Sequence, residues 1–175
     1  MIIALSLLLI LIAIILLITL AIIDFRTYYL PNIYVFPFAA AGILFHLATK
    51  AALLSPIFII AGALVGFLSL YVIRLVANHY YKKDTLGLGD VKLMGAAGIW
   101  LGLDGILLAL TIGAIAGMIH GVIYGLYLKH KHKKPVNFGQ LNIPAGPGFI
   151  IGIFLASIPL YKNFVLNMIA TIFNI

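Results

Sequence analysis

Cysteine and glutamate are both missing from this 175-residue chain, and all four of its acidic residues are aspartates. Without cysteine the protein has no disulfide, no thiol nucleophile and no thiolate ligand for a metal. Any chemistry that needs a carboxylate must come from the four aspartates. The position of each one is therefore informative.

Charge of either sign is also scarce. Charged residues make up 9% of the chain and hydrophobic residues 65%, with a mean hydropathy of +1.24, whereas soluble domains carry about 25% charged residues. This composition excludes a water-soluble fold and predicts an all-α membrane protein. The net charge of +7 is explained by basic loops on the cytoplasmic side, so we expect no nucleic-acid partner.

Apolar runs separated by short polar gaps predict six transmembrane helices in a single domain, residues 1–175. The first run has no basic residue before it and is long enough to span a bilayer, which favours a retained helix over a signal peptide. The segment 162–175 is either an interfacial helix or a continuation of the last span. The expected spans are about 2–23, 33–48, 53–77, 90–102, 105–128 and 143–160.

Basic residues are unevenly divided among the gaps between these spans. The first, third and fifth gaps hold Arg26 and six lysines, whereas the second and fourth hold only Lys50. Because basic loops stay in the cytoplasm, the N-terminus is expected outside a cell membrane that the chain crosses several times.

This topology sorts the four acids. Asp104 is expected on the outer side, and Asp84 follows two lysines in a polar loop, where it is expected to be a solvated charge. Asp24 and Asp90 lie at the cytoplasmic ends of two spans. Because a carboxylate beside hydrocarbon tends to face the interior of a helix bundle, these two acids are expected to meet.

Two adjacent carboxylates resist ionising together and share one proton near neutral pH. The protonated member can polarise a peptide carbonyl while the other activates a water, which is aspartic-protease chemistry and needs no metal or cofactor. Gly87 and Gly89, just before Asp90, allow unusual backbone conformations and leave room for a substrate strand. Taken alone, this glycine pair fits a flexible loop equally well.

Three segments resemble the signature segments of the prepilin peptidases, in the same order and on the expected spans. They are "DFRTYYLPN" (24–32), "GLGDVKLMGAAGIWLG" (87–102) and "IPAGPGFIIG" (143–152). The second contains the GxGD motif of that family. Ala145 stands where phenylalanine is common in the third.

The resemblance implies a six-helix intramembrane aspartic protease that removes short leaders from type IV pilins, pseudopilins or archaeal-type filament subunits at the cytoplasmic face. It assigns the catalytic roles to Asp24 and Asp90. The implied partners are prepilin-like proteins and membrane lipid, and no cofactor is implied. The residues that support the motifs are Pro31, Gly87, Gly89, Pro144, Gly146 and Pro147.

The chain resembles a short form of the family. Many bacterial members carry an N-terminal domain with two cysteine pairs and methylate the new N-terminus. This sequence begins with its first apolar span and contains no cysteine, so methylation of the product is not implied.

Lys92, two residues after Asp90, has two interpretations: tuning the ionisation of that acid, or snorkelling to the membrane interface. Residues i and i+2 lie on different helix faces, which favours the second. Glycines recur every fourth residue from Gly113 to Gly125. They indicate either a dimer interface or, as we favour, close packing inside the bundle.

Two other classes of function remain open. A small transporter could use Asp24 and Asp90 to relay protons or bind a cation. A scaffold subunit could use the glycine face. Neither explains why the three family-like segments occur together.

Overall fold

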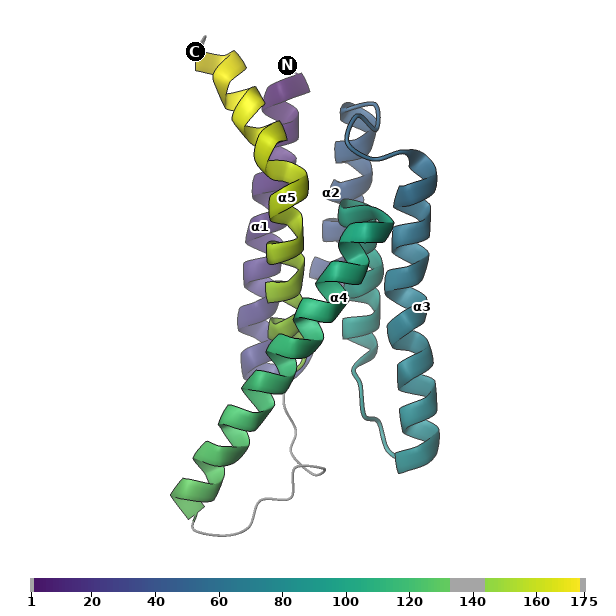
Figure 1. The fold of residues 1–175 in the computed structure, drawn as a ribbon, viewed down its shortest axis with the longest axis vertical. Coiled ribbons are helices and arrows are strands. Elements are labelled where there is room, and N and C mark those ends of the chain that lie inside the picture. The colour runs from purple at the N-terminus through teal and green to yellow at the C-terminus, as the bar shows by residue number, and fades with distance from the viewer. Residues whose placement is uncertain (1, 133–143, 174–175) are drawn as a thin grey trace.

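The computed structural model describes residues 2–132 and 144–173, and every regular element in those ranges is an α-helix (Figure 1). This confirms the all-α prediction. The helices are α1 (Ile2–Thr27), α2 (Asn32–Ala48), α3 (Pro56–Tyr81), α4 (Leu88–His132) and α5 (Gly146–Phe173).

Four of these helices, α1, α3, α4 and α5, are long and apolar enough to cross a membrane, and α2 is a shorter apolar helix. The predicted boundaries shift by a few residues. Helix α3 begins at Pro56 because proline suits the first turn of a helix. The segment after Lys162 continues α5 as far as Phe173, which decides between the two alternatives left open by the sequence.

Helix α4 covers both the fourth and the fifth predicted spans. Gly102 interrupts it with φ 67° and ψ −172°, a backbone conformation that glycine adopts readily and other residues rarely do. In Figure 1, α4 first rises beside α3 and then turns and descends across the bundle. The short gap expected between the two spans is this bend.

The first arm of α4 packs against α3 with the backbones nearly touching. A Cβ atom added at Gly98 would lie 2.1 Å from the carbonyl oxygen of Gly62, and one added at Gly66 would lie 2.3 Å from that of Met94. Helix pairs in membranes often rely on small residues for such close contact, since burial from water cannot drive their association. These glycines hold the GxGD-bearing arm in place.

Gly98→Ala should therefore destabilise the bundle, since the added methyl group overlaps the α3 backbone. Overpacking of this kind typically costs about 1–3 kcal/mol, and the midpoint of thermal unfolding in detergent, followed by circular dichroism, should fall. The matched control is Gly117→Ala, where an added Cβ meets nothing within 4 Å. Equal unfolding temperatures for the two variants would contradict this account of the α3–α4 contact.

The recurring glycines of α4 pack within the chain, at least in part. A Cβ atom at Gly148 would lie 2.9 Å from the Gly117 nitrogen, and one at Gly152 would lie 2.8 Å from the Gly113 nitrogen. The second arm of α4 and the start of α5 are therefore in close backbone contact. This supports the packing interpretation that we favoured over a dimer interface.

Candidate functional site

Asp24 lies in the last turn of α1, where the chain leaves the helix. Tyr28 ends the helix in a left-handed conformation (φ 55°), and its N–H donates to the Asp24 carbonyl at 2.9 Å. The Asp24 side chain is only 4% exposed. Its Oδ2 accepts a hydrogen bond of 3.0 Å from the N–H of Gly146, the first residue of α5. The positive end of the α5 dipole thus faces this carboxylate.

Asp90 lies in the first turn of α4 and is 7% exposed. The backbone amides of Gly87 and of Asp90 itself hydrogen-bond its carboxylate. Its Oδ1 is buried and receives no hydrogen bond from any residue that the structure describes. Because buried polar atoms are nearly always paired, a carboxylate oxygen in this state marks a candidate reactive group.

The fold brings these two acids together. They are 66 positions apart, yet the segments that carry them meet at Leu30, which contacts both Gly89, next to Asp90, and Gly146, next to Asp24. Two carboxylates that are buried close together do not readily carry two negative charges at once. Backbone amides at the starts of α4 and α5 offset part of this cost. Such a pair can hold one proton and can both donate to and accept from a reacting group.

Leu30, which the sequence analysis missed, is a buried residue beside the two acids. It is 3% exposed. A Cβ atom at Gly89 would lie 2.8 Å from its Cβ, and one at Gly146 would lie 3.3 Å from its Cδ1. Leu30 therefore contacts both of the other motif segments. The signal in the sequence was the Leu-Pro pair itself, of which only the proline was singled out.

Pro31 fixes the direction of the chain after Leu30. It is the N-cap residue of α2, with φ −68° and ψ 134°, and its carbonyl accepts the N–H groups of Tyr34 and Val35 at 3.1 and 3.3 Å. Proline restricts the residue before it to extended conformations. The Leu-Pro pair thus turns the chain sharply and presents the leucine to the site.

The motif glycines contribute space rather than unusual backbone conformation. A Cβ atom at Gly87 would lie 2.7 Å from the Oδ2 of Asp90, and one at Gly146 would lie 2.6 Å from the Oδ2 of Asp24. Among the described glycines, Gly102 alone has a positive φ. Gly87 and Gly89 therefore do not use the left-handed conformations that glycine allows, and the space they leave is what the structure shows.

Pro144 and Pro147 lie on either side of Gly146, the first residue of α5. Pro144 precedes the helix, and Pro147 is its buried second residue, a position where a missing N–H costs little. The N–H of Phe149 donates to the carbonyl of Ala145 at 3.2 Å. Ile143, which belongs to the same predicted motif, lies outside the described residues. Together the prolines leave the Gly146 amide free to bind Asp24.

Lys92 is directed toward α2 and away from the acids. Its Nζ donates to the Oδ1 of Asn32 at 3.2 Å and lies 5.8 Å from the centre of the Phe36 ring. It therefore joins α4 to the residue after Pro31. The structure offers no contact through which Lys92 would tune Asp90.

Asp84 is more than the solvated charge expected from the sequence. Although its side chain is 79% exposed, its Oδ1 forms a salt bridge of 2.7 Å with Arg74 and accepts a hydrogen bond of 2.9 Å from Asn78. Arg74 also donates to the carbonyl of Leu86, and the N–H of Thr85 donates to Asn78. This Arg74 clamp fastens the loop that leads into Gly87 to the end of α3.

Asp84 and Asp104 do not join the pair. Asp104 is exposed near the bend of α4. Within the described residues no group of three histidine, cysteine, aspartate or glutamate side chains could hold a metal ion.

Comparison with known proteins gives a family match for most of the chain. The model of the type IV leader peptidase family matches residues 11–122, which include both acids and the glycine pair. No solved structure matches the chain.

Several curated proteins with the name prepilin leader peptidase/N-methyltransferase are similar to the chain. The protein from Pectobacterium carotovorum subsp. carotovorum is 31% identical over 123 residues, which are 70% of this chain and 43% of that protein. The one from Dickeya chrysanthemi is 29% identical over 137 residues, 78% and 48% of the two chains. The one from Klebsiella pneumoniae is 40% identical over 87 residues, 50% and 37%. The chain thus spans less than half the length of these relatives.

Proposed function

The chain belongs to the type IV leader peptidase family, and we propose that it is an intramembrane aspartic endopeptidase that cleaves the leader from prepilin-like precursors at the cytoplasmic face. The observation that carries this proposal is the pair of buried acids, Asp24 and Asp90, at the meeting point of the three motif segments. Prepilin-like proteins are the proposed substrates. Methylation of the product is not part of the proposal.

The proposed mechanism uses one proton shared by the two carboxylates. The protonated acid donates a hydrogen bond to the scissile carbonyl, and the ionised acid removes a proton from the attacking water. The Gly146 amide holds Asp24 in a fixed orientation. The unpaired Oδ1 of Asp90 has free bonding capacity for the substrate or for the water. After the attack the C–N bond breaks, and the leaving amine takes the proton that the carboxylate removed from the water. The two carboxylates are then left with one shared proton, as before.

The proposed site faces the cytoplasm. The chain turns back at Gly102, so α4 supplies two of the six proposed spans. With that count, loop charge places the N-terminus outside and the segment between α3 and α4 inside. Asp24 and Asp90 then both lie at the cytoplasmic membrane boundary.

Cysteine labelling tests this orientation directly, because the natural chain has no cysteine. In intact cells, an impermeant thiol reagent should label Lys50→Cys and should label Lys83→Cys only after the membrane is opened. The readout is the mass shift of the purified protein. Labelling of Lys83→Cys in intact cells, with Lys50→Cys protected, would reverse the orientation and move the site to the outer face.

The activity itself is tested by co-expressing the chain with candidate prepilin-like precursors and determining their N-termini by mass spectrometry. Processing that depends on the chain, and that persists in the presence of chelators, supports the proposal. Precursors that stay intact beside a folded, membrane-inserted chain would count against those substrates. Failure with every precursor class would count against the activity.

A further inference from the structure

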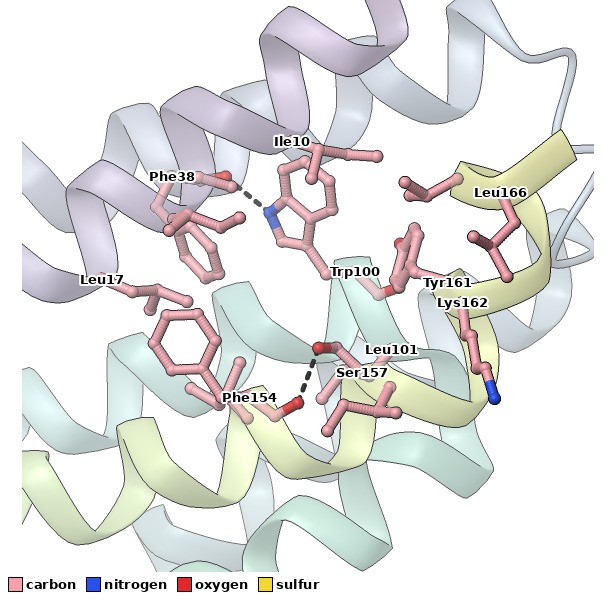
Figure 2. Close-up of a pocket in the computed structure, with 15 residues that line it drawn as sticks. Ile10, Leu17, Phe38, Trp100, Leu101, Phe154, Ser157, Tyr161, Lys162 and Leu166 are labelled. Atoms are coloured by element: carbon pink, nitrogen blue, oxygen red, sulfur yellow. Dashed lines mark hydrogen bonds between the residues drawn. The ribbon is translucent and has the colours of Figure 1, made fainter. Parts of the chain in front are cut away.

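A cavity lies away from the acids, between α1, α5 and the first arm of α4, with Phe38 of α2 at one side (Figure 2). Its volume is about 420 Å³, within the range typical of ligand sites. Several of its lining side chains are exposed on the outside of the bundle, among them Ile14, Ile158 and Leu166. The cavity therefore opens sideways to the membrane.

The position of the cavity along the helices indicates which leaflet of the bilayer it mainly faces. On α5 its lining runs from Ile153 to Leu166, a length of ~20 Å at the helical rise per residue. Ile153 is itself ~10 Å along the helix from Gly146. Since one leaflet fills about half of a 30 Å hydrocarbon core, the cavity starts on the acids' side of the midplane and lies for most of its length in the leaflet opposite the acids.

The size of the cavity limits what can occupy it. A volume of about 420 Å³ along ~20 Å is several times smaller than the volume that a helix would occupy over the same length. A helix with its side chains needs about 10–12 Å across. A single hydrocarbon chain fits this cavity, and a peptide helix does not.

The polar groups that line the cavity are already satisfied. The Trp100 Nε1–H donates to the carbonyl of Phe38 at 2.9 Å, and the Tyr161 hydroxyl donates to the carbonyl of Trp100 at 2.7 Å. The Ser157 hydroxyl donates to the carbonyl of Phe154 at 2.7 Å. A polar small molecule would find few partners here, because these groups are used within the protein.

Lys162 supplies a charge at the rim. Figure 2 shows its amine directed away from the cavity interior, and it lies ~24 Å along α5 from Gly146. The one salt bridge among the described residues joins Arg74 and Asp84, so no described acid neutralises Lys162. An ammonium group at this depth reaches for the polar boundary of the membrane, where lipid phosphates lie.

We propose that this cavity binds one acyl chain of an anionic phospholipid from the leaflet opposite the acids, with the phosphate of its headgroup on Lys162. The chain enters sideways between α1 and α5. It packs against Trp100 and Phe38 and fills a space that the helices leave open. This is a lipid site separate from the two carboxylates.

Trp100 is the only tryptophan in the chain, so its fluorescence reports on this cavity alone. The full-length protein is reconstituted in vesicles of phosphatidylcholine with increasing fractions of phosphatidylglycerol brominated on its acyl chains. Bromine quenches tryptophan at short range, so emission should fall and saturate. The control titration uses brominated phosphatidylcholine in the same phosphatidylcholine background. Half-maximal quenching should then need a fraction of brominated lipid about five-fold higher than with phosphatidylglycerol, which is the preference expected from one basic residue at a membrane surface.

Two variants separate the parts of the proposal. Lys162→Ala should reduce the preference for the anionic lipid to about one while quenching persists. Ser157→Phe, which fills the cavity, should abolish saturable quenching. Leu155→Phe, on the outer face of α5 and outside the cavity lining, is the matched control and should behave like the wild type. Unchanged emission in unbrominated vesicles verifies that each variant is folded.

Three results would overturn the proposal. The first is quenching that rises without saturation, equally for both lipids, in the wild type. The second is a Ser157→Phe protein that is quenched like the wild type. The third is relief of quenching by an apolar peptide helix but not by unbrominated phosphatidylglycerol, which would make a peptide the occupant.

Discussion

Asp24→Asn and Asp90→Asn should each abolish leader processing while leaving the protein folded and in the membrane. Asparagine is nearly isosteric with aspartate but cannot act as a base or carry the shared proton. Loss of one general acid or base typically lowers a rate by about 10²–10⁴, and loss of half of a cooperating pair should lower it more. Processing is measured as the fraction of precursor with a trimmed N-terminus over time.

The double variant should be little worse than either single variant, because residues that act as a unit are not additive. Asp104→Asn is the matched control, since that side chain is exposed and lies outside the site. Asp84→Asn is unsuitable as a control because Asp84 belongs to the Arg74 clamp. Processing at an ordinary rate by Asp24→Asn would show that the site is assigned wrongly. Intact processing in both variants, with loss of proton-coupled uptake, would favour a transporter.

Gly87→Ala and Gly146→Ala should also cause large losses of processing, with far smaller effects on folding. In each case the new methyl group would lie less than 3 Å from the Oδ2 of one of the acids. The carboxylate must then rotate away, and for Gly146→Ala the hydrogen bond between the amide and Asp24 is strained as well. A misplacement of about 1 Å can lower an enzymatic rate about 10²-fold.

The expected pattern is a fall in kcat with the unfolding temperature close to that of the wild type. This distinguishes the two site variants from Gly98→Ala, for which we expect the stability to fall first. Gly117→Ala again serves as the control, with no neighbour within 4 Å of the added atom. Full activity in Gly87→Ala, at a normal level of accumulation, would mean that the glycine before Asp90 is only a linker.

Much of the helical layout could be predicted from the sequence, because hydropathy and helix-breaking residues act locally. The all-helical fold was expected, and so were the limits of α2. The importance of Asp24 and Asp90 followed from their scarcity and from their positions at the ends of apolar runs. That they should meet was expected from the predicted topology, which put both at the same membrane boundary.

The details of the site depended on which side chains face each other, and local patterns do not show this. Leu30 looks like any leucine until Gly89 and Gly146 are found against it. Arg74 lies near the end of a helix, where its sequence neighbours show no partner, yet it donates to the carbonyl of Leu86, twelve residues farther along the chain. Lys92 was placed correctly away from Asp90 by helix geometry, but its partner, Asn32, is sixty residues away.

The hydrogen bond from Gly146 to Asp24 joins residues 122 positions apart, and this separation has a consequence for biosynthesis. The ribosome makes Asp24 early and Gly146 late. While α1 to α4 insert, the Asp24 carboxylate lacks the amide that orients it, and Leu30 lacks one of the two surfaces it packs against. If the proposed pair of acids needs the Gly146 amide, the nascent chain should stay inactive until α5, its last described helix, docks.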